Sequence, residues 1–311
     1  MEFFHKKTSY PFMHTRKVWY AVSAVMILVS IVSLAVRGLN FGIDFTGGVV
    51  LELNFPQAAD LEKVRAGLEK AGFGDAAVQS FGTSRDVLVR LLPEEGQDVN
   101  VLGRNVLAAV QAGDPGVELR RTEVVGPQVG QELAEKGALA VLFTFLLIMA
   151  YVALRFQWKL GVGAIVAALH DPIVILGFFS LSGLTFDLPA LAAILAVIGY
   201  SLNDTVVVFD RLRERFIAVR KGTPEQVIDM AVNETLSRTI MTSATTMLTV
   251  LALLFFGGEI LRGFATALTI GIVVGTYSSI YIASATALDL KLTARDLLPA
   301  QREKGAVDDM P

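Results

Sequence analysis

The chain has 311 residues, of which 53% are hydrophobic and 18% are charged, with a formal net charge of −3 and no cysteine. One soluble core cannot bury so much apolar surface, so the composition excludes an ordinary soluble protein and indicates helices that face lipid. No basic patch of the kind that grips nucleic acid is present, and the lack of cysteine excludes disulfides and thiolate metal ligands.

Six apolar segments are each long enough to cross a bilayer as a helix, at about 1.5 Å per residue. We predict membrane helices over residues 18–36, 137–154, 160–181, 188–209, 239–256 and 264–288. The first follows a basic N-terminus, as in a signal peptide, but it is longer than a signal peptide's apolar region and no small-residue cleavage site follows it. It is therefore predicted to be a retained helix.

The distribution of Lys and Arg predicts how these helices are oriented. If the N-terminus is cytoplasmic, the tails 1–17 and 289–311 and the inner loops hold sixteen such residues, whereas the short outer loops hold only Arg262. Both termini are therefore predicted to be cytoplasmic, and the long segment 37–136 is predicted to lie on the other side of the membrane.

The loop over residues 210–238 is predicted to be cytoplasmic and amphipathic. Gly222 interrupts the preceding helix, and Thr223 before Pro224 and Glu225 is typical of a new helix start. We expect this second helix to lie along the membrane surface before it enters the fifth span.

The segment 37–136 has the patterns of a small α/β domain. Strands are predicted over 47–55, 76–81, 86–92 and 117–125, with a turn at 82–85, and helices over 58–72 and 98–113. The order β-α-β-β-α-β is that of the ferredoxin-like split motif. The predicted fold class is thus a six-helix membrane protein with one extracytoplasmic ferredoxin-like α+β domain between its first two helices, an architecture that carries no function by itself.

Asp204, in the fourth predicted span, is the first candidate for chemistry, because a charge within a lipid-spanning helix is costly unless it is paired or hydrated. Counted from the outer helix ends, Asp204 lies ~24 Å deep and Arg238 ~28 Å deep, so the two could meet as a charge-assisted pair with Asn203 beside them. Arginine stays protonated, so only Asp204 can exchange a proton. The pair is either a proton relay or a static ion pair, and Arg238 could instead be an anchor at the interface.

His170, Asp171 and Pro172, near the middle of the third span, form a second candidate site. A His–Asp pair can relay protons, whereas Pro172 frees a backbone carbonyl and kinks the helix, and we favour the second interpretation. No further His lies in any predicted helix, so no metal site is predicted. The fifth span carries a group of hydroxyl residues, Thr239, Thr242, Ser243, Thr245, Thr246 and Thr249. We expect these to bond back to their own helix or to neighbours rather than to line a wet path beside Asp204.

The motif GIDFTGG, from Gly42 to Gly48, follows the first span. Glycines such as Gly47 allow positive φ or close backbone approach, and Asp44 could cap or order the corner, so we interpret the motif as architectural and as a candidate hinge. In the sixth span, Gly271 and Gly275 have the G-x-x-x-G spacing of a close helix contact.

No serine-hydrolase, zinc-protease or nucleotide-binding signature occurs in the chain. Asp171 and Asp204 differ in estimated depth by about 8 Å, whereas a shared-proton aspartyl dyad needs its carboxyl groups about 3 Å apart. The chain is therefore not predicted to be an enzyme.

Four stretches together resemble a known family. They are GIDFTGG at 42–48, VGPQVGQELAEKG at 125–137, the His-Asp pair at 170–171 and IGYSLNDTVVVFDRLRE at 198–214. The sequence is similar to the SecF family, the smaller partners of SecD in the accessory complex of the bacterial Sec translocase, within the resistance-nodulation-division superfamily. The resemblance covers about residues 10–295, and Pro172 departs from the apolar residue expected after the His-Asp pair.

The resemblance implies a multi-pass protein of the bacterial cytoplasmic membrane that pairs with SecD in a twelve-helix unit and draws on the proton-motive force to promote preprotein export. It assigns Asp204 and Arg238 to the proton pathway, with protons as the coupling ion and no cofactor. The implied partners are SecD, the SecYEG translocon with YajC and YidC, the translocating preprotein and membrane lipid. The alternatives are a non-energised scaffold for SecD or the translocon, and a small-molecule exporter of the same superfamily.

Overall fold

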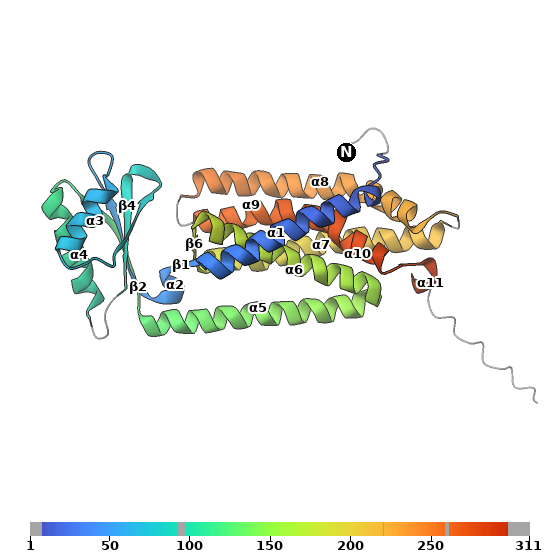
Figure 1. Ribbon diagram of the computed structural model, residues 1–311, viewed down its shortest axis with the longest axis horizontal. Coiled ribbons are helices and arrows are strands. Elements are labelled where there is room, and N and C mark those ends of the chain that lie inside the picture. The colour runs from blue at the N-terminus through green and yellow to red at the C-terminus, as the bar shows by residue number, and fades with distance from the viewer. Residues whose placement is uncertain (1–7, 93–96, 220, 259–260, 298–311) are drawn as a thin grey trace, which may run out of the picture.

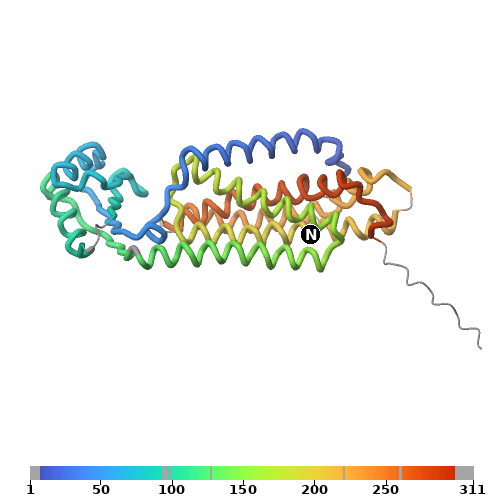
Figure 2. The backbone as a smooth tube through the Cα atoms, turned by 60° about the horizontal axis from the view of Figure 1, so that its bottom comes forward, coloured from blue at the N-terminus to red at the C-terminus, as the bar shows by residue number. Residues whose placement is uncertain are grey.

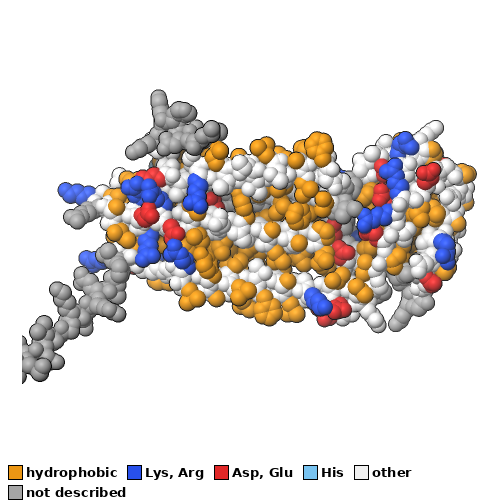
Figure 3. Space-filling view, turned by 180° about the vertical axis from the view of Figure 1, so that it is seen from behind, with side chains coloured by type: hydrophobic (Ala, Val, Ile, Leu, Met, Phe, Trp, Pro, Cys, Tyr) orange, Lys and Arg blue, Asp and Glu red, His pale blue; other side chains and the backbone are white. Residues whose placement is uncertain are grey.

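Six helices long and apolar enough to cross a membrane run along the long axis of the structure (Figure 1), a computed structural model that describes residues 8–92, 97–219, 221–258 and 261–297. They are α1 (Arg16–Arg37), α5 (Pro127–Arg155), α6 (Trp158–Ser182), α7 (Leu188–Ala218), α8 (Pro224–Phe256) and a last rod made of α9 (Arg262–Tyr277), a π-helical segment (Ser278–Ala283) and α10 (Ser284–Asp289). The short α11 (Ala294–Leu297) follows. A band of hydrophobic side chains covers the middle of the bundle, and charged side chains gather at its ends (Figure 3).

The expected surface helix before the fifth span does not exist as a separate element. Instead, α8 runs unbroken from Pro224 to Phe256. Thr223 and Gln226 form a reciprocal capping box that starts the helix, and no glycine or proline follows to interrupt it before Gly257. The polar first turns of α8 therefore continue directly into its apolar part.

Several other boundaries differ from those expected. Helix α5 begins at Pro127, ten residues before the predicted span, because Pro at the first turn and a run of good helix formers extend it toward the α/β domain. The predicted N-terminal tail is partly packed: a 3-10 turn at Met13–Thr15 precedes α1, and the Met13 and Tyr10 backbone N–H groups donate to Asp229 and Asn233 of α8. The remainder of both predicted tails, residues 1–7 and 298–311, lies outside the described residues.

Small residues set how the helices pack. Helices α6, α7 and α9 lie at the centre of the bundle, while α1 and α5 run along its outside (Figure 2). A Cβ added to Gly271 would lie 2.2 Å from Val197 of α7, and one added to Gly177 would lie 2.0 Å from Ser30 of α1. The predicted close contact of the G-x-x-x-G pair is thus confirmed and falls on α7, because helices in lipid associate through small residues.

The α/β domain at one end consists of β2 (Gly48–Asn54), α3 (Leu61–Lys70), β3 (Ala77–Phe81), β4 (Thr83–Leu91), α4 (Val99–Gly113) and β5 (Glu118–Val125). Its strands pair antiparallel in the order β3-β4-β2-β5. Alternate residues such as Leu51 and Val89 face α3 and α4 and are fully buried. The turn between β3 and β4 is tighter than predicted, because Gly82, at a φ of 73°, makes it almost alone.

A short parallel ladder ties the loops at this end of the bundle together. Strand β1 (Asn40–Phe41), just after α1, pairs with β6 (Thr185–Phe186), between α6 and α7. The one-turn helix α2 (Ile43–Thr46) then leads into β2 of the domain. The chain thus passes from bundle to domain along a fixed backbone path.

Candidate functional site

Asp204 is buried in the centre of the bundle, at 8% exposure. Its carboxylate is held by two hydroxyl groups from other helices. The Thr239 Oγ1 hydroxyl of α8 donates to Oδ1 over 2.8 Å, and the Ser279 Oγ hydroxyl of the π-helical segment donates to Oδ2 over 2.6 Å. Both carboxylate oxygens are therefore bonded by neutral donors across helix interfaces.

The expected contact between Asp204 and Arg238 is absent. Within the described part of the chain, no ion pair of 4.0 Å or less joins the two, although Arg238 is near enough to act on Asp204 through space. Neighbouring residues of a helix point about 100° apart. Because Thr239 faces the bundle, Arg238 faces outward and is exposed. The depth estimate did not reveal which face each residue takes.

Asn203 and Thr242, the other residues placed beside Asp204 by sequence, both point outward. The Thr242 hydroxyl donates to the carbonyl oxygens of Arg238 and Thr239 in its own helix. The predicted back-bonding is thus confirmed for Thr242, and also for Thr245, Thr246 and Thr249. Thr239 and Ser243 bond to neighbouring helices, as the prediction also allowed: Thr239 donates to Asp204, and Ser243 bonds Thr276 of α9.

A second buried carboxylate lies close to the first. Asp171 of α6 is fully buried and its Oδ1 lies 2.9 Å from His170 Nδ1. Its Oδ2 accepts from Ser201 of α7 over 2.5 Å and from Ser278 over 3.0 Å. The His170-Asp171 pair is therefore more than a helix kink, because it is a bonded part of the interface between three helices.

The serines that join the two carboxylates were not singled out from the sequence. Ser278 and Ser279 are adjacent, and each donates to a different aspartate. Ser201 precedes Asp204 by one turn of α7, about 4.5 Å along the axis. The sequence signal was the position of these residues, a Ser-Ser pair in an apolar span and a serine one turn before an intramembrane aspartate, because serine hydroxyls bond across helices in membranes.

The glycine motif forms the corner between bundle and domain. The Asp44 carboxylate accepts from the Leu188 backbone N–H over 2.9 Å, so it orders the first turn of α7. Gly47 and Gly48 have φ values of 68° and 131°, and a Cβ on Gly48 would lie 2.6 Å from the Leu91 carbonyl oxygen. Gly42 has an ordinary φ of −70°, and its backbone N–H donates to the Phe186 carbonyl oxygen of β6 over 2.9 Å. The architectural interpretation therefore has a specific steric basis.

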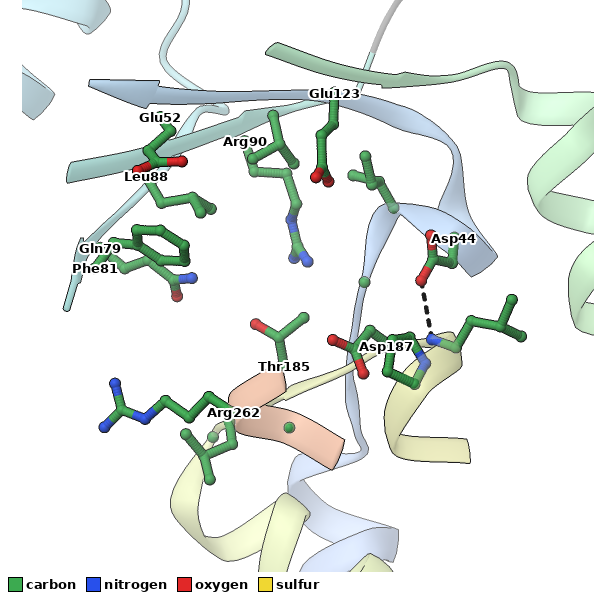
Figure 4. A pocket seen from close by; sticks show the side chains of 18 of the residues that line it. Asp44, Glu52, Gln79, Phe81, Leu88, Arg90, Glu123, Thr185, Asp187 and Arg262 are labelled. Atoms are coloured by element: carbon green, nitrogen blue, oxygen red, sulfur yellow. Dashed lines mark hydrogen bonds between the residues drawn. The ribbon is translucent and has the colours of Figure 1, made fainter. Parts of the chain in front are cut away.

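A cavity of about 440 Å³ separates the domain from the bundle beside this corner (Figure 4). The face of the sheet opposite α3 and α4 lines one wall, and the β6 loop lines the other. Arg90 reaches across from β4, bonding the Phe41 carbonyl and, over 3.1 Å, the Asn40 side chain. Burial raises the pKa of Asp187, whose carboxylate caps α7, and the nearby Asp44 charge adds to this effect. Arg90 thus ties the sheet to the β1 segment through a backbone carbonyl and an amide side chain, beside the stacked Phe45 and Phe186 rings.

Two family descriptions match the chain: "Protein export membrane protein SecD/SecF, C-terminal" over residues 105–293 and "SecD/SecF GG Motif" over residues 32–59. The protein translocase subunit SecF of Vibrio alginolyticus is 49% identical over 96% of this chain and 96% of its own length. The chain belongs to the SecF family. The SecF proteins of Pseudomonas aeruginosa and Escherichia coli O157:H7 are 49% and 41% identical, over 96% and 98% of this chain and 97% and 95% of theirs.

Solved SecDF structures have the same fold as this SecF-family chain. The translocon-associated SecDF from Thermus thermophilus superposes with a TM-score of 0.81 at 38% identity, and a super-membrane-facing form of SecDF superposes with 0.69. These matches cover 91% and 93% of this chain but 39% of each SecDF chain. The matched family regions contain both carboxylate sites and the glycine corner, so the geometry described above lies in the part that defines the family.

Proposed function

We propose that this SecF-family chain is an accessory subunit of the Sec protein translocase that, with SecD, uses the proton-motive force to promote preprotein export across the bacterial cytoplasmic membrane. The observation that carries the proposal is Asp204, a carboxylate within a membrane helix whose partners are the hydroxyls of Thr239 and Ser279. Protons are the coupling ion, and no cofactor is required.

Hydroxyl partners suit a group that changes its protonation state. An ionised carboxylate accepts the hydroxyl hydrogen, whereas a protonated one can donate to the hydroxyl oxygen. The Ser279 hydroxyl has an alternative acceptor in the Thr276 carbonyl oxygen, 3.1 Å away, to which it can turn when Asp204 is protonated. Both states of Asp204 can therefore be hydrogen-bonded without a counter-ion, which a fixed Asp–Arg pair would prevent.

We place SecD on the outward face of α8 beside Asp204. Polar side chains lie there at membrane depth: Arg238, Thr242, Thr245 and Thr249 of α8 and Asn203 of the adjacent α7 are exposed, and Thr246 is half-buried. Polar groups that face lipid are costly, and a partner bundle that covers them removes the cost. In this arrangement Arg238 and Asn203 lie at the boundary between the two subunits, where the proton enters or leaves.

In the proposed topology both termini are cytoplasmic and the ferredoxin-like α/β domain is extracytoplasmic. The uneven distribution of Lys and Arg supports this orientation. Ion pairs such as Arg211–Glu234 and Arg155–Asp210 gather at the end opposite the domain. The domain would then act with SecD on preprotein that emerges from the SecYEG translocon. YajC and YidC are further proposed partners of the complex.

Export into inverted membrane vesicles that contain SecD tests the proposal. Asp204→Asn should reduce the proton-dependent stimulation of export at least about tenfold, since protonation can no longer change the charge at this position. Asp210→Asn is the matched control on the same helix, because Asp210 is partly exposed and pairs with Arg155. It should export normally.

Three other outcomes would count against the proposal. Normal export by Asp204→Asn, with SecD still bound, would contradict a proton role and leave a non-energised scaffold. Loss of SecD from the purified complex would instead mean that Asp204 serves assembly. Unchanged preprotein export with impaired efflux of small molecules would favour the exporter alternative.

A further inference from the structure

The His170-Asp171 pair is a buried titratable site that the proposed role of Asp204 does not use. His170 is 2% exposed and Asp171 is fully buried. Asp171 has three side-chain partners, from α6 itself, α7 and the π-helical segment. Apolar residues of similar size could pack the same space without the cost of burying polar groups. The presence of a buried, hydrogen-bonded His–Asp pair therefore indicates a chemical role.

His170 Nε2 points to that chemistry. Among the residues that the structure describes, this buried atom has no hydrogen-bond partner. When Asp171 is ionised its carboxylate can only accept, so in that state Nδ1 carries the hydrogen of the bond to Oδ1. Nε2 of the neutral ring then holds a lone pair that can take a proton.

The adjacent serines connect this pair to Asp204. The Ser278 hydroxyl has two acceptors, Asp171 Oδ2 at 3.0 Å and the Gly275 carbonyl at 3.2 Å. The Ser279 hydroxyl likewise has Asp204 Oδ2 and the Thr276 carbonyl. Each hydroxyl carries one hydrogen, so it bonds either the ionised carboxylate or its own helix. Protonation of one aspartate therefore changes the bonding of a π-helical segment that also holds the other.

We propose that His170 and Asp171 form a second proton-binding site, coupled to Asp204 through the Ser278–Ser279 step of the π-helical segment. A proton binds at His170 Nε2, the Nδ1 hydrogen passes to Asp171 Oδ1, and the pair gains one proton while the ring stays neutral as its other tautomer. The Ser278 hydroxyl then turns to the Gly275 carbonyl. The inference rests on the proposed proton coupling, to which it adds a second binding site and a route between the two.

Few other titratable groups face the pair. From α9, the Tyr277 ring lies 6.0 Å from the His170 ring, and its hydroxyl bonds the Trp19 carbonyl and Ser23 of α1. From α7, the nearest acid is Asp204, and Arg238 of α8 acts on Asp204 through space. Within the described residues, the charge that responds most directly to Asp171 is therefore that of Asp204.

Infrared titration of the purified complex with SecD tests the coupling, because each protonated carboxyl group gives its own C=O band. Difference spectra should assign one titrating band to each buried acid, of which Asp171→Asn removes one and Asp204→Asn the other. Asp171→Asn should also move the midpoint of the Asp204 band by about one pH unit or more, as expected for two buried acids that are held by adjacent serines and interact in a low-dielectric interior. His170→Gln should slow or abolish protonation at Asp171.

Ser278→Ala keeps both acids and removes the connection, so it should reduce the coupling between the two midpoints. Ser180→Ala is the matched control, since Ser180 is a buried serine of α6 that bonds Ser33 of α1, away from both acids. It should leave both bands unchanged. If Asp171→Asn does not assemble with SecD, the Ser278→Ala titration tests the coupling between the two acids in its place.

The proposal is overturned if no band belongs to Asp171, or if the Asp204 midpoint is the same in the wild type and in both variants. These readouts do not depend on export. Normal export by Asp204→Asn would remove the proposed function while leaving proton binding at Asp171 measurable, so the two ideas fail separately.

Discussion

Two buried aspartates, one in each region of the molecule, have similar hydrogen bonds but different charged surroundings. Asp86 of β4, at 6% exposure, accepts from Thr83 over 2.5 Å and from Asn54 over 2.6 Å, and it also lies 3.4 Å from Arg120. Asp204, at 8% exposure, accepts from two hydroxyls, and in the described part of the chain no cation lies within 4.0 Å of it.

The difference shows what each carboxylate can do. The Thr83 hydrogen bond, followed by the Asn54 bond and the Arg120 charge, outweighs burial and holds the pKa of Asp86 below its usual value. Asp86 therefore stays ionised and fixes the end of the sheet. Asp204 has hydroxyl partners that can also accept and, among the described residues, no cation within 4.0 Å, as the proposed proton exchange requires. The nearby Arg120 charge, added to the hydrogen bonds of Asp86, is the feature that Asp204 lacks.

The largest effect is expected when the hydroxyl donors of Asp204 are removed. Thr239→Val with Ser279→Ala keeps the side-chain volumes close but deletes both bonds, each about 1.5–3 kcal/mol when made to a charged group. Proton-dependent export should fall at least about tenfold. Thr235→Val on the same helix, whose buried hydroxyl donates to the Ala231 and Val232 carbonyls of its own backbone, should change export less than about twofold. Equal effects would mean that Asp204 does not depend on these donors.

The corner that joins the two regions should be nearly as sensitive. Gly48→Ala adds a Cβ that would lie 2.6 Å from the Leu91 carbonyl, at a φ of 131°. We expect the free energy of unfolding to fall by roughly 2–4 kcal/mol in a thermal or denaturant titration of the complex. Gly72→Ala is the control, because Gly72 has a φ of 88° with nothing within 4 Å, and it should cost only about 1 kcal/mol. Similar losses would show that the close approach to Leu91 is unimportant.

Asp86→Asn should have a smaller effect that depends on pH. Because the folded-state pKa is below the unfolded one, the ionised group stabilises the domain above the unfolded pKa of about 3.9, and this stability is lost as pH falls through the folded pKa. Hydrogen exchange of the β4 amides should show a loss of about 1–2 kcal/mol at pH 7 that disappears as the pH falls through the lowered folded-state pKa. The exposed Asp75→Asn should show no such trend. A pH-independent loss would contradict the ionised role of Asp86.

Arg120→Ala should have the smallest effect, and it makes Asp86 more like Asp204. Arg120 is 54% exposed, so the loss should be about 0.2–0.5 kcal/mol, and the pKa of Asp86 should rise toward its ordinary value. A carboxylate titration by nuclear magnetic resonance measures the pKa. Salt at about 1 M should reduce the difference between wild type and variant through screening. A large, salt-independent loss would indicate that Arg120 acts through packing instead.

Most of the secondary structure followed from local patterns. Asp98 caps α4, the Thr223 capping box begins α8, and Gly72 and Gly113 lie at helix ends, within a residue or two of the predictions. Helix α3 begins at Leu61, three residues later than predicted, because the Asp60 side chain caps it there. Local signals were sufficient because caps and breakers act on neighbouring backbone groups. The unbroken α8 was missed because charged residues within a helix do not end it.

The sequence by itself determined which segments are apolar enough to enter a membrane, the order of the α/β elements, the glycine corner and the presence of intramembrane acids. Only the tertiary structure decided that Asp204 binds Thr239 and Ser279 rather than Arg238, and that Asp171 shares the same π-helical segment. The physical reason is that depth in a helix follows from residue counting, whereas the face that a side chain presents depends on how each helix is rotated against its neighbours.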